Sequence, residues 1–141
     1  MNWSVILIAG VVFAVILGLK RLGLVAVEEA RKHLNAGAVV VDVRSAHEFQ
    51  AGHLPEAMNI PLGELQTRIP RHVPDKSRVL LLHCLSGTRS SIARRVIKAM
   101  GYTRVFNLGS YRRAQRIVSS ASAGILLASR RRANKSDSKA V

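Results

Sequence analysis

Short apolar strands that alternate with helices constrain this chain more than any other feature of its sequence. Runs rich in Val, Ile and Leu predict four strands, over residues 38–43, 57–61, 78–83 and 104–107. Amphipathic spacing and helix-terminal residues predict four helices, over residues 27–36, 62–69, 90–100 and 111–118. Residues 46–56 contain Gly52 and Pro55 and are predicted to form a loop that could include one helical turn. The alternation is typical of an α/β domain, so we predict a mostly parallel sheet with helices on both faces.

The N-terminal segment Trp3–Leu19 forms a separate unit, because it carries no charged side chain. As a helix it would span roughly 25 Å, near the lower limit for crossing the ~30 Å core of a bilayer. A cleaved signal peptide is the alternative, but Met1-Asn2 offers no basic residue and Lys20–Leu22 is a poor cleavage site. We therefore predict that residues 1–21 are an uncleaved, single-pass membrane anchor with a basic flank. The positive-inside rule then places the rest of the chain on the cytoplasmic side.

Within this predicted anchor, small residues recur at every fourth position, at Gly10, Ala14 and Gly18. Such a face could pack two helices together and give a weak homodimer. Glycine and alanine are also common in membrane helices without any such role, and that simpler interpretation is the stronger of the two.

The chain is strongly basic, with a formal net charge of +14. That charge could indicate nucleic-acid binding, but no nucleic-acid motif is present and only 4% of residues are aromatic, which argues against a base-stacking surface. Attraction to anionic lipid is the simpler explanation for a tethered domain. Residues 22–118 are predicted to form the folded domain, and residues 119–141 a basic, mostly disordered tail.

The sole cysteine, Cys84, directly follows a predicted buried strand and precedes a helix. In an open α/β sheet this edge, beyond the carboxyl ends of the strands, is where ligands bind. The loop from Leu85 through Ser86, Gly87 and Thr88 can curl so that its backbone N–H groups point inward and hold an anion. Arg89 adds a permanent positive charge at its end. These neighbours should lower the pKa of the thiol, so we predict that Cys84 is a nucleophile.

Three stretches of the sequence give a more specific indication: VVVDVRSAHEFQAGHLPEAMNIPL (39–62), LLHCLSGTRSSIARRVIKAMGY (81–102) and VFNLGSY (105–111). In this order and spacing the chain resembles a rhodanese-type sulfurtransferase domain. The resemblance covers most of residues 24–118. It weakens after Val118, where an aromatic-rich glycine turn that many members have is represented by Tyr111 alone.

The resemblance implies that Cys84 carries a persulfide, that residues 85–88 supply the backbone amides, and that Arg89 binds substrate. It implies transfer of sulfane sulfur from a donor such as thiosulfate to cyanide or a thiol. Related phosphatases have one more residue between cysteine and arginine, which makes phosphatase or arsenate reductase chemistry a minor alternative here. The main alternative is a membrane-tethered sulfur carrier or recruitment module with little turnover.

Asp42 and Arg44 end the first predicted strand and could border the active loop and tune it. A structural ion pair, for example between Arg44 and Glu48, is the simpler interpretation. No second cysteine accompanies Cys84 and the histidines lack ligand spacing, so neither a metal site nor a cofactor is expected.

Overall fold

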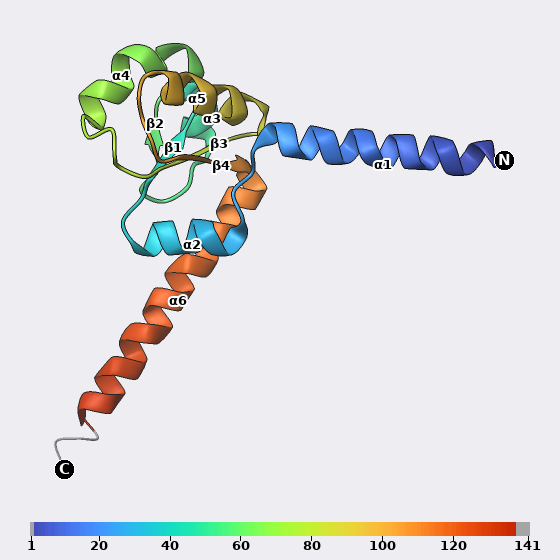
Figure 1. Cartoon of the computed structure of the whole chain (residues 1–141). Coiled ribbons are helices and arrows are strands. Elements are labelled where there is room, and N and C mark those ends of the chain that lie inside the picture. Colours follow the sequence, from blue (N-terminus) through green and yellow to red (C-terminus); the bar gives the residue numbers. More distant parts are fainter. Residues whose placement is uncertain (1, 138–141) are drawn as a thin grey trace.

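The computed structural model describes residues 2–137, and within that range the side chains of all residues except 19–22 and 128–137. Its elements follow in the order α1 (Trp3–Leu22), α2 (Val27–Asn35), β1 (Val39–Asp42), α3 (Ala46–Ala51), β2 (Met58–Asn59), the 3-10 turn η1 (Leu62–Glu64), α4 (Leu65–His72), β3 (Leu80–Cys84), α5 (Thr88–Ala99), β4 (Val105–Ser110) and α6 (Tyr111–Asp137). Figure 1 shows how they are arranged.

The four strands form one parallel sheet in the order β2-β1-β3-β4, with β3 in its interior. The side chains of β1 and β3 alternate between the two faces of the sheet, and each face is covered. One hydrophobic cluster contains Leu80 and Leu82 together with residues of α4 and α5, such as Ile69 and Ile97. The other contains Leu81 and residues of α2 and α6. The predicted parallel α/β sheet with helices on both faces is therefore confirmed.

Two helices were not predicted correctly. Residues 46–51 form α3 because Ser45 and Glu48 make a capping box: the Ser45 hydroxyl accepts from the Glu48 amide, and the Glu48 carboxylate accepts from the Ser45 amide. The helix expected to end before Pro70 continues through it to His72. Pro70 removes only one backbone donor, and the Val73 amide closes the last turn by donating to the Ile69 carbonyl at 2.8 Å.

The prediction of a disordered tail is wrong for residues 119–137, because α6 continues through all of them. The hydroxyls of Ser120 and Ser122 donate to backbone carbonyls three and four residues earlier, at 2.8 and 3.1 Å. Ala121 is buried against the domain, and the alanines and basic residues that follow have high helix propensity. Residues 138–141 of the predicted tail lie outside the described residues.

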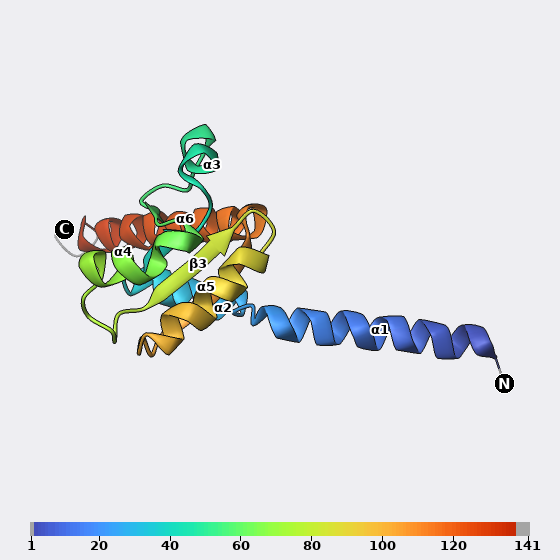
Figure 2. The same ribbon diagram turned by 90° about the horizontal axis from the view of Figure 1, so that it is seen from above.

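The predicted N-terminal helix is present as α1, which leaves the body of the domain as a single projecting rod (Figures 1 and 2). Its large apolar side chains are exposed, from 44% at Leu17 to 75% at Trp3. Among the residues that the structure describes, no helix combines the length and apolar character that crossing a membrane requires. The prediction of a transmembrane helix is thus not supported by the structure.

Candidate active site

Cys84 is the last residue of β3, and its side chain is fully buried. The chain then turns through Leu85, Ser86 and Gly87 before α5 begins at Thr88. The thiol therefore lies at the carboxyl edge of the parallel sheet, at the start of a twelve-residue helix. This is the position at which open α/β sheets bind ligands and at which helix amides favour an anion.

The turn after Cys84 depends on two glycines that lie against each other. Gly87 has a φ of +102°, and its amide donates to the Cys84 Sγ at 3.0 Å. A Cβ at this position would lie 3.3 Å from the Cα of Gly109, which itself has a φ of +91° at the bulge in β4. Gly87 is therefore required both for the turn and for the close approach of the loop to β4.

Opposing effects act on the Cys84 thiol. Burial by itself raises the pKa, but hydrogen bonds from the backbone amide and the hydroxyl of Ser90, and from the amides of Gly87 and Ser86, outweigh it and lower the pKa below the ordinary value. The Ser90 Oγ lies 3.6 Å from the Sγ and is itself buried. The loop thus favours a thiolate, the form of cysteine that acts as a nucleophile.

Not every predicted loop residue faces the sulfur with its side chain. Leu85 is 59% exposed, and its carbonyl accepts from the Tyr111 amide at 3.2 Å. The Ser86 and Thr88 hydroxyls contact each other at 3.4 Å. Of the amides predicted to surround the sulfur, those of Ser86 and Gly87 act on the thiol. Ser90 was not predicted as part of the site. The sequence feature that could have identified Ser90 is its position one helical turn after Gly87.

Arg89 lies beside the thiol but is held by a carboxylate of α3. Its two terminal nitrogens donate to the two oxygens of Glu48, each at 2.7 Å. This contact holds the pKa of Glu48 at about 2, well below its ordinary value. The two side chains are 36% and 29% exposed, so solvent reaches both of them. The guanidinium that was predicted to bind substrate is thus already paired with a carboxylate.

Asp42 and Arg44 form a buried ion pair behind the site. The Arg44 Nη2 donates to the Asp42 carboxylate at 2.6 Å and to the Gly52 carbonyl at 2.7 Å. The guanidinium also lies 4.6 Å from the centre of the Tyr111 ring. The structural interpretation is supported, but the suggested partner was wrong: Arg44 binds Asp42, while Glu48 binds Arg89.

His83 precedes the nucleophile and is fully buried. Among the described residues neither of its ring nitrogens has a hydrogen-bond partner, and Nε2 lies 3.8 Å from the Asp42 carboxylate. Burial is the main cause that lowers its pKa, and it outweighs the opposing effect of the Asp42 carboxylate, while the Arg44 charge lowers the pKa further. His83 is therefore neutral near pH 7 and is not a source of positive charge for the Cys84 thiolate.

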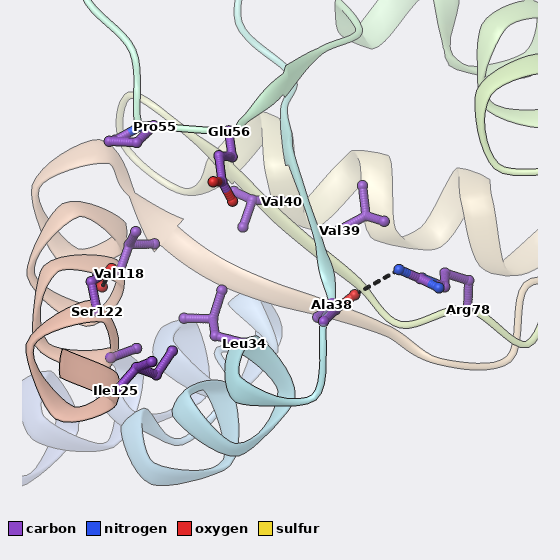
Figure 3. A pocket seen from close by; sticks show the side chains of 12 residues that line it. Leu34, Ala38, Val39, Val40, Pro55, Glu56, Arg78, Val118, Ser122 and Ile125 are labelled. Atoms are coloured by element: carbon purple, nitrogen blue, oxygen red, sulfur yellow. Dashed lines mark hydrogen bonds between the residues drawn. The ribbon is translucent and has the colours of Figure 1, made fainter. Parts of the chain in front are cut away.

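A cavity of about 340 Å³ lies at the other edge of the sheet (Figure 3). Ala38 and Val39, at the start of β1, line it together with Leu34 of α2 and Ile125 of α6. Because the strands are parallel, the start of β1 lies at the amino-terminal end of the sheet and the end of β3 at its carboxyl-terminal end. The cavity is lined by both apolar and charged side chains, among them Glu56 and Arg78, and is separate from the Cys84 site.

Comparison with known proteins agrees with this geometry. The rhodanese-like domain family matches residues 26–115. The thiosulfate sulfurtransferase PspE of Escherichia coli is 41% identical over 69 residues, which are 49% of this chain and 66% of that protein. A putative sulfur carrier protein of Bacillus subtilis is 33% identical over 49% of this chain and 36% of its own length.

Solved structures give the same result for the fold. A human single-domain sulfurtransferase is 31% identical, with a TM-score of 0.58 over 67% of this chain and 96% of that one. An E. coli rhodanese with bound anions is 36% identical, with a TM-score of 0.53 over 55% of this chain and 91% of that one. The chain thus covers nearly all of these solved domains, but less than two thirds of the first curated relatives.

Proposed function

The chain belongs to the rhodanese-like domain family, and on this premise we propose that it is a sulfurtransferase that works through a persulfide on Cys84. The observation that carries the proposal is the position of the Cys84 Sγ. It is buried among the Gly87 amide and the Ser90 hydroxyl, and these donors lower its pKa. The similarity to sulfurtransferases of E. coli and human supports the same chemistry.

In the first step, the Cys84 thiolate attacks the outer sulfur of a donor such as thiosulfate. A sulfur–sulfur bond to Cys84 forms, the sulfur–sulfur bond of thiosulfate breaks, and sulfite leaves with the electron pair. In the second step, cyanide or a thiolate attacks the outer sulfur of the persulfide, and the Cys84 thiolate is released. The loop amides hold the negative charge in both states, which is the contribution expected from preorganised donors.

Arg89 is proposed to bind the anionic donor through its guanidinium, next to the thiol. Because Glu48 already occupies two of its donor groups, the donor has to compete with that carboxylate or share the guanidinium with it. Arg89→Ala should therefore raise KM for thiosulfate more than it lowers kcat. An unchanged KM would contradict this role.

The decisive experiment is the intact mass of the full chain before and after thiosulfate, followed by cyanide. We expect Cys84 to gain one sulfur atom, and cyanide to remove it as thiocyanate over many cycles. Cys84→Ser should neither gain the sulfur nor turn over. Residual turnover in that variant would refute the mechanism.

A sulfur carrier or recruitment module with little turnover is the second candidate. It is favoured by the Arg89–Glu48 contact, which withdraws the guanidinium from free substrate, and by the similarity to a putative sulfur carrier. A carrier would load with sulfur once and release it slowly to cyanide. Comparing the amount of thiocyanate with the amount of protein separates the two candidates.

We further propose that α1 anchors the domain in a membrane, with the domain on the cytoplasmic side. The exposed apolar side chains of α1 support this, because an apolar rod of this kind is stable in lipid and unfavourable in water. The basic residues Lys20 and Arg21 lie at the end of α1 that leads into the domain, which favours a cytoplasmic position for the domain. A reporter fused to the C-terminus, together with carbonate extraction of membranes, would test both parts.

A further inference from the structure

A second cavity lies between α2 and α6, away from the reaction described above. It is a cavity of about 270 Å³. Its lining residues are Val27, Arg31, Arg113, Arg116, Ile117 and Ser120. Three of these six side chains carry a permanent positive charge, and none is acidic. A water molecule takes roughly 30 Å³ in the liquid, so the cavity is large enough for a tetrahedral anion and part of its ester group.

Two of the arginines are held in place by neutral groups. The Arg31 Nε donates to the Ser120 hydroxyl at 2.9 Å. Arg113 is half-buried, and its terminal nitrogens donate to the backbone carbonyls of Leu108 and Val25, the latter at 2.6 Å. These contacts fix the direction of the guanidinium groups without neutralising their charge. Two of the three arginines are therefore oriented before any ligand arrives.

Little of this positive charge is balanced by the surrounding described residues. Glu28 lies 3.5 Å from Arg31, but it is 71% exposed, and such surface pairs contribute little. Burial lowers the pKa of Arg113, and the charge of Arg116 lowers it further, as expected for like charges placed close together. An anion between these guanidinium groups would relieve that repulsion.

We propose that this α2–α6 cavity binds a phosphate-type anion through Arg31, Arg113 and Arg116. Guanidinium groups match the oxygens of a phosphate in geometry and charge. The anion could be the headgroup of a membrane lipid or a free phosphate. The headgroup is favoured by position, because Val25 and Val27 follow α1 directly, and by the apolar Val27 and Ile117 beside the charges.

The test uses the full chain in zwitterionic detergent micelles. It is titrated with inorganic phosphate, with a short-chain phosphatidylglycerol and with a short-chain phosphatidylcholine. Binding is followed by the NMR signals of the arginine side chains. We expect saturable binding of an anionic ligand and none of phosphatidylcholine. Preference for phosphatidylglycerol identifies a headgroup site, and preference for inorganic phosphate identifies a free-anion site.

Arg116→Gln is the test variant, because this side chain is exposed and its loss should leave the fold intact. Arg112→Gln is the matched control, because it removes the same charge from an exposed position of the same helix outside the cavity. We expect about tenfold weaker binding in Arg116→Gln and unchanged binding in Arg112→Gln. An equal loss in both variants, or no saturable binding to the parent chain, would overturn the proposal. Sulfur loading of Cys84, measured in parallel, separates this result from the proposed reaction.

Discussion

Arg89 at the start of α5 and Glu48 in α3 form a two-point ion pair, with both nitrogen–oxygen distances at 2.7 Å. The pair links α3 to α5 and occupies the guanidinium that interacts with the thiol. The Arg89 guanidinium also interacts with the charge of the Cys84 thiolate. Glu48 therefore competes for this guanidinium with any anion that approaches the nucleophile. This competition sets the first prediction.

Glu48→Gln should lower KM for thiosulfate by several-fold, because an amide binds a guanidinium less strongly than a carboxylate does. Initial rates over a range of thiosulfate concentrations measure this. Glu64→Gln is the matched control, since Glu64 pairs with Arg68 in α4 and should leave KM unchanged. A higher KM in Glu48→Gln would show instead that the carboxylate positions Arg89 for the donor.

The same pair predicts how stability depends on pH. The pKa of Glu48 is about 2 in the folded chain, below the ordinary 4.5. A carboxyl group whose pKa is lower in the folded chain than in the unfolded chain contributes its full stabilisation above the unfolded-state pKa. This contribution is lost as the pH falls through the folded-state pKa. The free energy of unfolding of the parent should therefore fall relative to that of Glu48→Gln between about pH 5 and pH 2. Urea titrations of both chains over this range measure it, and parallel curves would contradict the assigned pKa.

Ser90→Ala should raise the pKa of Cys84, because it removes the hydroxyl that lies 3.6 Å from the Sγ. The rate of alkylation by iodoacetamide as a function of pH reports this pKa, and its midpoint should move to higher pH. Ser86→Ala is the control, since Ser86 acts on the thiol through its backbone amide, which the substitution retains. Equal midpoints in the parent and Ser90→Ala would exclude the hydroxyl as a stabiliser of the thiolate.

Much of this architecture follows from local sequence. Strands β1 and β3 were predictable because their apolar runs are buried, and the Cys84 turn because Gly87 lies between a strand and a helix. The capping box formed by Ser45 and Glu48 is also a local feature, because the two residues lie three positions apart in the sequence. The partner of Glu48 was not predictable, because Arg89 is 41 positions away and only the tertiary fold brings the two side chains together.

The length of the C-terminal helix α6 could not be predicted from composition. Low hydrophobicity after Val118 suggested disorder, but Ala121 packs against the domain and Ile125 lines a cavity with Leu34. A helix that is already nucleated by packing extends at little cost through residues of high propensity. The extent of α6 therefore depends on the packing of residues such as Ala121 against the domain, which composition does not reveal.

Gly87→Ala should destabilise the chain by about 1–2 kcal/mol, the ordinary cost of a left-handed conformation at a residue with a Cβ. The added carbon would also press on the backbone of Gly109, so the amide that donates to Cys84 should shift and turnover should fall. Gly63→Ala is the control, because a Cβ there meets nothing within 4 Å. Thermal unfolding and initial rates measure both effects. Full stability with full activity in Gly87→Ala would disprove the role of this turn.

Asp42→Asn should destabilise the fold by about 3 kcal/mol, because it leaves the buried Arg44 guanidinium without its counter-charge. The two side chains are 0% and 7% exposed, so water cannot replace the lost partner. Glu64→Gln again serves as the control, because its exposed pair with Arg68 should contribute less than about 1 kcal/mol. Urea unfolding of the three chains at pH 7 measures the difference. If Asp42→Asn cost no more than Glu64→Gln, the carbonyl of Gly52 and the ring of Tyr111 would suffice to hold Arg44, and Asp42 would not be needed to support the strand that ends beside Cys84.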